Sequence, residues 1–143
     1  MWNVPVGVRL VVFHAYPALI TLVIVGNAIL AAWALAADLR RTRLSAFFWT
    51  ATLVVVALVA LQAAAGILLT FGGGRPRAPL HFLYGILVVA AAAVQFGLRP
   101  AGFLRRSMLR DPARGREPRM LALLCLTQAA LLARAYTTGA LGR

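Results

Sequence analysis

The sequence predicts an all-α membrane protein, a bundle of four transmembrane helices within one domain that covers residues 1–143. Two observations carry this prediction. Of the 143 residues, 62% are hydrophobic and only 13% are charged, whereas soluble domains carry about 25% charged residues. The apolar residues also gather in four long runs, which excludes both a soluble globular protein and a disordered one.

Each apolar run is long enough to cross a bilayer as a helix, because about 20 residues span the roughly 30 Å of hydrocarbon. The runs are rich in Ala and Leu and show no alternation of the kind that a membrane β-barrel needs. The expected spans are residues 10–37, 44–71, 80–98 and 120–140. Pro17 lies inside the first span, where we expect it to bend the helix.

The arginines predict the orientation, since short cytoplasmic loops carry an excess of positive charge. All 15 basic residues are arginines: ten lie in the connections 38–43 and 99–119, and four lie at the termini and in the loop 72–79. Both termini are therefore expected outside, in a multi-pass protein of a prokaryotic-type cell membrane. The net charge of +12 thus indicates topology, and nucleic acid is not an expected partner.

The cytoplasmic segment 99–119 mixes apolar and basic residues. Between Pro100 and Arg110, Phe103 and Leu104 are followed by Arg105 and Arg106. This pattern fits a short amphipathic helix on the inner leaflet, and a solvated basic loop fits it equally well. The lipid bilayer is the one partner that the sequence predicts directly.

Three ionisable residues lie inside the apolar spans: His14, His81 and Arg134. Such residues are functional candidates by default, because a charge is costly in hydrocarbon. At 1.5 Å per residue, the distances from Arg9 to His14 and from Arg77 to His81 are about 6–8 Å. Arg134 lies about 9 Å from the end of its span on the same side. The three side chains are therefore expected in one layer near the outer face.

Two imidazoles from separate helices at one depth suit a haem with two axial histidine ligands, His14 and His81. Small residues leave room for a planar ring beside them: Gly85 on the helix of His81, Gly66 beside Gln62, and Ala18, Thr21 and Val25 on the first helix. The expected cofactor is haem b, with other haem types left open.

Haem propionates need cations at the membrane edge, and the expected partners are Arg134, Arg75 and Arg77. Tyr84, one turn from His81, is a candidate hydrogen-bond partner in the site. Each residue also has a simpler interpretation. A histidine near a helix end is often only interfacial, Arg134 can reach lipid phosphate, Gln62 can bridge helices, and Tyr84 fits an aromatic belt.

The segment from Leu61 to Gly85 resembles a helix hairpin of the haem A synthases. The shared pattern is Gln62, Gly66 and Thr70, then an outer Gly-rich loop, then His81 with Gly85. The fourth span ends in Arg134-Ala135-Tyr136-Thr137-Thr138-Gly139, which is similar to the Arg-x-Thr-Gly ending of that family's first helix. The helix order here resembles a cyclic permutation of one four-helix half.

The resemblance implies a bundle that holds haem between His14 and His81 near the outer face. The synthases carry a Glu before a ligand histidine, but the only acids here are Asp38, Asp111 and Glu117, all in cytoplasmic loops. The paired outer-loop cysteines of some synthases are also missing, since Cys125 is the only cysteine. These departures favour a protein that holds haem over one that modifies it.

The leading hypothesis is a small b-type cytochrome that transfers electrons, as a subunit of a larger complex, between a quinol or membrane partner and an outer acceptor. A homodimer is left open. The first alternative is a non-redox structural or accessory membrane subunit, and the second is a haem-modifying enzyme of the synthase type. Whether the chain is an enzyme is left undecided.

Overall fold

The computed structural model of the protein describes residues 14, 16–108 and 116–141. Its elements are α2 (Pro17–Leu39), α3 (Ala46–Phe71), α4 (Leu80–Leu98), α5 (Arg105–Met108), α6 (Arg116–Tyr136) and a π-helix, η2 (Thr137–Leu141). Every element in this part of the chain is helical, as the sequence predicts.

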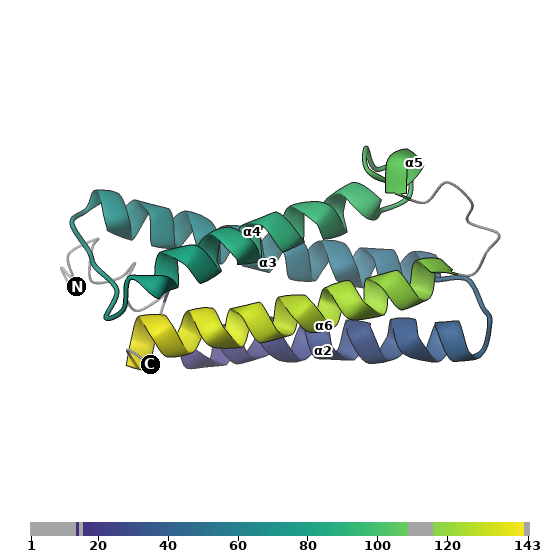
Figure 1. Ribbon diagram of the computed structural model, residues 1–143, viewed down its shortest axis with the longest axis horizontal. Helices are drawn as coiled ribbons and strands as arrows, with labels where there is room; N and C mark the ends of the chain where they lie inside the picture. The colour runs from purple at the N-terminus through teal and green to yellow at the C-terminus, as the bar shows by residue number, and fades with distance from the viewer. Residues whose placement is uncertain (1–13, 15, 109–115, 142–143) are drawn as a thin grey trace, which may run out of the picture.

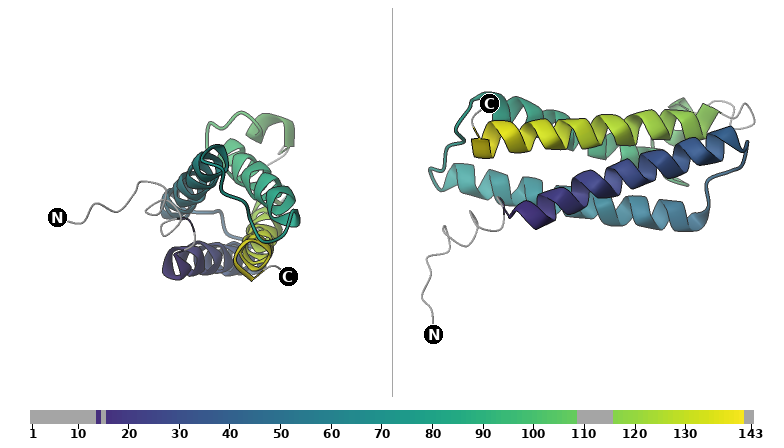
Figure 2. Two further views of the ribbon diagram at one scale, coloured as in Figure 1. Left: turned by 90° about the vertical axis from the view of Figure 1, so that its left-hand side faces the viewer. Right: turned by 90° about the horizontal axis from the view of Figure 1, so that it is seen from below.

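Four long helices run along the bundle, and each is long and apolar enough to cross a membrane. The start of α2, the α3–α4 loop and the end of α6 lie at one end; the α2–α3 loop and α5 lie at the other (Figures 1 and 2). This arrangement confirms that the four spans alternate in direction. We call the end that carries the α3–α4 loop the His end, because His14 and His81 lie there.

The bounds of α3 and α4 agree with the expected spans to within two residues, whereas α6 begins at Arg116, before the expected residue 120, and the first span differs at its start. Pro17 does not bend a helix that continues through it. It is the first residue of α2, and Tyr16 before it has an extended backbone (φ −66°, ψ 110°). Proline fits the first helical position because the amide it lacks would have no partner there. Residues 10–13 and 15 of the expected span lie outside the described residues.

Local sequence accounts for the other ends. The Ser45 hydroxyl accepts a hydrogen bond from the Phe48 amide at 3.2 Å and so caps α3. Gly72 follows the last residue of α3, and Gly73 takes a positive φ of 84° in the turn toward α4. The last span ends in η2, which continues α6 with a wider helical turn up to Leu141.

Small residues bring α2 and α6 together along much of their length. Ala31, Ala34 and Ala37 are buried on one face of α2, and α2 packs more extensively against α6 than against α3. Lipid tails are as apolar as leucine, so helices in a membrane associate through close packing of small residues. The remaining core divides into two clusters.

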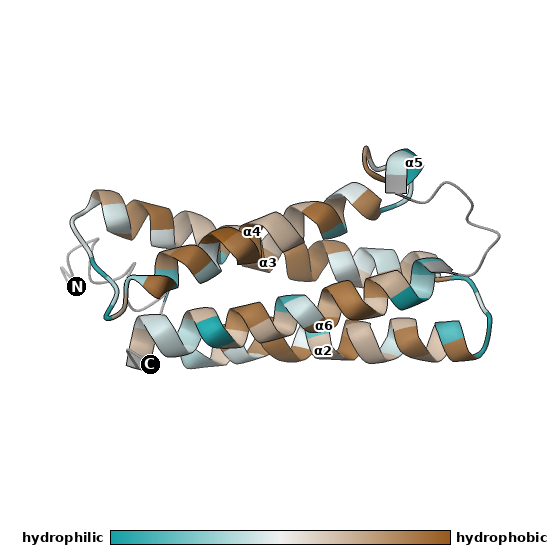
Figure 3. Cartoon of the chain, viewed as in Figure 1, coloured by the Kyte–Doolittle hydropathy of each residue, from teal (hydrophilic) through white to brown (hydrophobic). Residues whose placement is uncertain are grey.

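One cluster lies toward the α5 end and includes Phe48, Trp49 and Leu98; the other includes Val23, Val59, Val88, Ala92 and Leu132. Many large apolar side chains point outward instead, such as Leu22, Ile86 and Leu123, which are 56%, 67% and 62% exposed. Figure 3 shows apolar residues along all four long helices and hydrophilic residues concentrated at the connections. Such a surface suits a lipid environment.

At the opposite end of the bundle, two ion pairs among the described residues join neighbouring segments. Arg105 binds Glu117 through two hydrogen bonds of 2.7 and 3.1 Å, and Arg119 binds Asp38 at 3.0 Å. The expected amphipathic helix in segment 99–119 is only the four-residue α5 among the described residues, and 109–115 lie outside them.

Candidate functional site

The rings of His14 and His81 lie next to each other at the His end, with perpendicular planes. His14 precedes α2, and His81 lies in the first turn of α4, yet the ring centroids are 5.9 Å apart with an interplanar angle of 88°. The prediction that both imidazoles share one layer is therefore confirmed.

Each imidazole is held by a backbone carbonyl of a different helix. His14 Nδ1 lies 3.0 Å from the carbonyl oxygen of Gln62 in α3, and His81 Nδ1 lies 2.8 Å from that of Ala135 in α6. A carbonyl oxygen can only accept, so Nδ1 donates in both rings. In a neutral ring Nε2 then carries a free lone pair, which is the tautomer that binds a metal.

Two glycines make room for these rings. A Cβ on Gly66 would lie 2.8 Å from His14 Cε1, and a Cβ on Gly139 would lie 2.5 Å from His81 Nδ1. Real Cβ atoms do not approach so closely, so any larger residue would displace the ring. Gly139 belongs to η2, and π-helical turns are frequent at functional sites. Gly139 ends the motif that begins at Arg134 but was not among the predicted site residues.

Arg134 belongs to the same layer, because the next residue in the chain, Ala135, accepts the hydrogen bond from His81. Its guanidinium carbon lies 5.6 Å from the centre of the Tyr84 ring, a cation–π contact. Tyr84 therefore interacts with Arg134 at this site. The acids Asp38 and Glu117 pair with other arginines at the far end of the bundle. Neither of them neutralises Arg134.

Gln62 belongs to the site through its backbone, and its side chain carries a donor that is unpaired among the described residues. Its carbonyl oxygen accepts the hydrogen bond from His14, as described above. Its side-chain nitrogen is buried and has no hydrogen-bond partner among the described residues. A buried donor of this kind favours a ligand that offers an acceptor.

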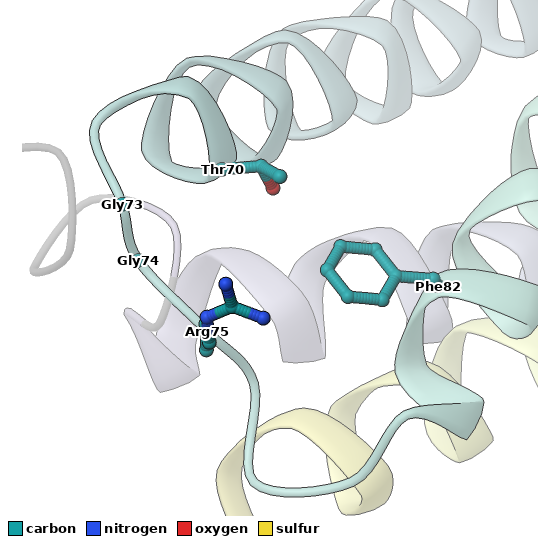
Figure 4. Close-up of a pocket in the computed structure, with 5 residues that line it drawn as sticks. All are labelled: Thr70, Gly73, Gly74, Arg75 and Phe82. Carbon is teal, nitrogen blue, oxygen red and sulfur yellow. The ribbon is translucent and has the colours of Figure 1, made fainter.

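Arg75 lies in the loop beside a small hollow. A pocket of about 140 Å³ is lined by Thr70, Gly73, Gly74, Arg75 and Phe82. Figure 4 shows the guanidinium of Arg75 directed into the space between Thr70 and Phe82. The Phe82 ring centroid lies 6.3 Å from that of His81, so this hollow adjoins the histidine pair. Arg77 lies exposed in the same loop.

The space expected for a planar ring is only partly present. A Cβ on Gly85 would meet no atom within 4 Å, so there is room at that turn. One and two turns further along α4, Val88 and Ala92 are buried in the core. The face of α2 with Ala18, Thr21 and Val25 points outward, and its expected role beside the histidines is wrong.

The physical reason for this error is the break at Pro17. His14 precedes α2, so counting turns from His14 along a continuous helix does not give the inward face of α2. That face carries Ile20, Val23 and Asn27 instead.

The histidine pair can serve as two axial ligands. The described residues contain no group of three or more His, Cys, Asp or Glu that could hold a metal ion, but a porphyrin supplies four nitrogens itself. A metal–imidazole bond is about 2 Å long and a ring nitrogen lies about 1 Å from its ring centre, so two axial imidazoles place their centroids about 6 Å apart. The observed 5.9 Å fits this separation.

Three buried amide side chains were missed by the sequence analysis: Asn27, Gln95 and Gln128, each fully buried between the helices. The signal was available, because uncharged polar residues in apolar spans often form hydrogen bonds across helices.

A scan of protein-family models and searches of curated proteins and solved structures gave no match to this chain.

Proposed function

We propose that this protein is a small membrane b-type cytochrome that holds haem between His14 and His81. One observation carries the proposal: both rings donate Nδ1–H to backbone carbonyls at 3.0 and 2.8 Å while their centroids lie 5.9 Å apart. This combination leaves both Nε2 atoms unprotonated in the neutral rings, and the separation of the centroids is close to that of two axial imidazoles.

The chain's own residues would prepare and orient the ligands. The carbonyls of Gln62 and Ala135 fix the tautomer and the plane of each imidazole, and such hydrogen bonds raise ligand basicity. Gly66 and Gly139 allow the rings to lie directly against α3 and η2. A bound haem iron supplies reversible one-electron chemistry.

Cations and donors at the same end suit the two propionates. Arg134 offers a planar pair of donors, and the buried nitrogen of Gln62 is available for an acceptor. Arg75, which lies near Phe82, and Arg77 would bind propionate or the water around it at the membrane edge. Arg134 is the stronger candidate because it adjoins the carbonyl that orients His81.

The arginine distribution supports an orientation with both termini outside, in a prokaryotic-type cell membrane. The histidine pair then lies near the outer face. From this position the protein would exchange electrons with an outer acceptor and with a quinol or neighbouring membrane subunit, as part of a larger assembly.

A reduced-minus-oxidised optical spectrum of the purified full-length chain tests the proposal. A Soret band and an α band of low-spin haem, at about one haem per chain, are expected. A colourless protein that still lacks these bands after haem is added would overturn the proposal and favour the structural alternative. Conversion of the bound haem into another haem over time would favour the enzyme alternative.

A further inference from the structure

A layer of buried polar side chains lies inside the bundle, away from the histidine pair. We call Asn27, Gln95, Cys125 and Gln128 the amide layer. All four side chains are 0% exposed, and they come from α2, α4 and α6. This layer is independent of the proposed haem site, because no residue is shared.

The hydrogen bonds determine which way each amide points. Asn27 donates its side-chain nitrogen to the Val23 carbonyl at 2.9 Å, so its oxygen faces Gln95. The Gln95 nitrogen donates to that oxygen at 3.0 Å and also contacts Cys125 Sγ at 3.4 Å. Turning the Gln95 amide over would set two oxygens against each other. Its orientation is therefore fixed.

The Gln128 amide is fixed in the same way. Its nitrogen donates to the Val88 carbonyl at 3.1 Å across to α4. A carbonyl oxygen can only accept, so the amide nitrogen and not the amide oxygen faces it. Both glutamine oxygens are consequently acceptors. Neither Gln95 Oε1 nor Gln128 Oε1 receives a hydrogen bond from the described residues.

Two buried acceptors without donors are costly, because each oxygen loses its hydrogen bonds to water and gains none in return from the described residues. They lie close in depth, because Gln95 contacts Cys125 and Gln128 follows Cys125 by three residues, about 4.5 Å along α6. A ligand for this layer must donate hydrogen bonds and be small enough to fit between packed helices. A metal cation is disfavoured, because none of the layer's side chains is a carboxylate that could offset its charge in hydrocarbon.

We infer that the amide layer is a water-binding site, in which ordered water donates to Gln95 Oε1 and Gln128 Oε1. Buried waters in proteins make about three hydrogen bonds to polar groups that are otherwise unsatisfied. The two glutamine oxygens and the Cys125 thiol beside Gln95 provide such partners.

Hydroxyl-radical footprinting of the full-length protein in lipid nanodiscs tests this inference. Radiolysis generates radicals from water at the place where it is bound, so Cys125 should be oxidised although it is fully buried. Phe48 is also 0% exposed, but it lies among Trp33 and Trp49 in apolar packing. It should remain unmodified and serves as the internal reference.

A relocated thiol provides the matched control. Ala34 is 0% exposed in apolar surroundings, so the variant Cys125→Ala/Ala34→Cys carries a dry buried cysteine. Its oxidation should be severalfold lower than that of Cys125 in the unaltered protein. Equal oxidation of the two thiols would overturn the inference, because water would then reach any buried cysteine.

Substitution of the two glutamines, which removes the acceptor oxygens, is the second test. Gln128→Met and Gln95→Met keep the length of the side chain but remove its amide, and each should lower Cys125 oxidation severalfold. Unchanged oxidation in both variants, or an unmodified Cys125 in the unaltered protein, would overturn the inference. An unmodified Cys125 in the unaltered protein overturns the inference even if a variant does not fold.

Discussion

The imidazoles of His14 and His81 are perpendicular and 5.9 Å apart, and each is bound to the backbone of a different neighbouring helix. His14 is held by α3 and His81 by α6. The pair therefore joins four segments of the bundle at one end. Because a backbone carbonyl cannot be mutated away, the two rings are oriented by the fold itself.

Removing either ring should have the same effect if both bind one iron. His14→Ala and His81→Ala are each expected to convert six-coordinate low-spin haem into a five-coordinate or empty site. The double variant should add little, because the two ligands act as one unit. Optical and electron paramagnetic resonance spectra of the purified variants measure this.

Imidazole added to the buffer provides the control for folding. It should restore the low-spin spectrum of His81→Gly, where the ligand alone is missing. If His14→Ala instead keeps an unaltered low-spin signal, His14 is not a ligand and the pairing is wrong.

Gly66 and Gly139, the two glycines that adjoin the imidazole rings, should be as important for haem binding as the histidines. Gly66→Ala and Gly139→Ala place a Cβ 2.8 and 2.5 Å from His14 Cε1 and His81 Nδ1, so both rings must shift and lose their carbonyl bonds. We expect altered spin state and lower haem content, with about 1–3 kcal/mol lost in stability. Absorption spectra and thermal unfolding of each variant are the measurements.

Gly72→Ala is the matched control for these variants. Its Cβ would lie 3.5 Å from the nearest atoms, an ordinary contact, and its φ of −77° suits alanine. It should behave as the unaltered protein. An unchanged spectrum in Gly66→Ala and Gly139→Ala would mean that the rings need not keep the orientation seen here.

Sequence reasoning predicted the helices well because their signal is local. The expected spans 44–71 and 80–98 correspond to α3 (Ala46–Phe71), which begins two residues later, and to α4 (Leu80–Leu98), which has the same bounds. The meeting of His14, His81 and Arg134 was predictable for a similar reason, since helical rise converts sequence distance into depth. The depth of a residue along its helix can therefore be estimated without knowing which helices contact each other.

The sequence could not show what depends on rotation and packing. The inward face of α2 was assigned wrongly because Pro17 separates His14 from α2. The carbonyl partners of the histidines belong to the backbone of Gln62 and Ala135, and no side chain marks them. The amide layer was overlooked because the candidates were chosen around the three ionisable residues, which brought in Gln62 but not Asn27 or Gln95, although both lie within the spans.

Arg134 should serve an anion at the site. Arg134→Leu removes the charge and the donors, and we expect a loss of about 1.5–3 kcal/mol in haem binding, about ten- to a hundredfold in affinity. Arg134→Lys keeps the charge but loses the planar fork, so its loss should be smaller. Titration of each purified variant with haem measures the two affinities. Equal affinity in Arg134→Leu and the unaltered protein would assign Arg134 to lipid phosphate.

The proposed topology rests on the distribution of the arginines and can be tested with single cysteines in a Cys125→Ala background. Ala78→Cys lies in the α3–α4 loop at the His end, and Thr42→Cys lies in the α2–α3 loop at the opposite end. A membrane-impermeant maleimide should label Ala78→Cys in intact cells and label Thr42→Cys only after lysis. The reverse pattern would place the histidine pair at the cytoplasmic face.

Gly85→Ala distinguishes a haem protein from a purely structural bundle. In the protein alone the added Cβ meets no atom within 4 Å, and alanine favours a helix over glycine by about 0.5–1 kcal/mol. The apoprotein should therefore be slightly more stable in thermal unfolding. If a porphyrin lies beside the first turns of α4, the same methyl group enters its space, and haem affinity should fall. A variant with raised stability and unchanged haem affinity would show that Gly85 does not adjoin the cofactor, and raised stability in a chain that never binds haem would favour the structural subunit.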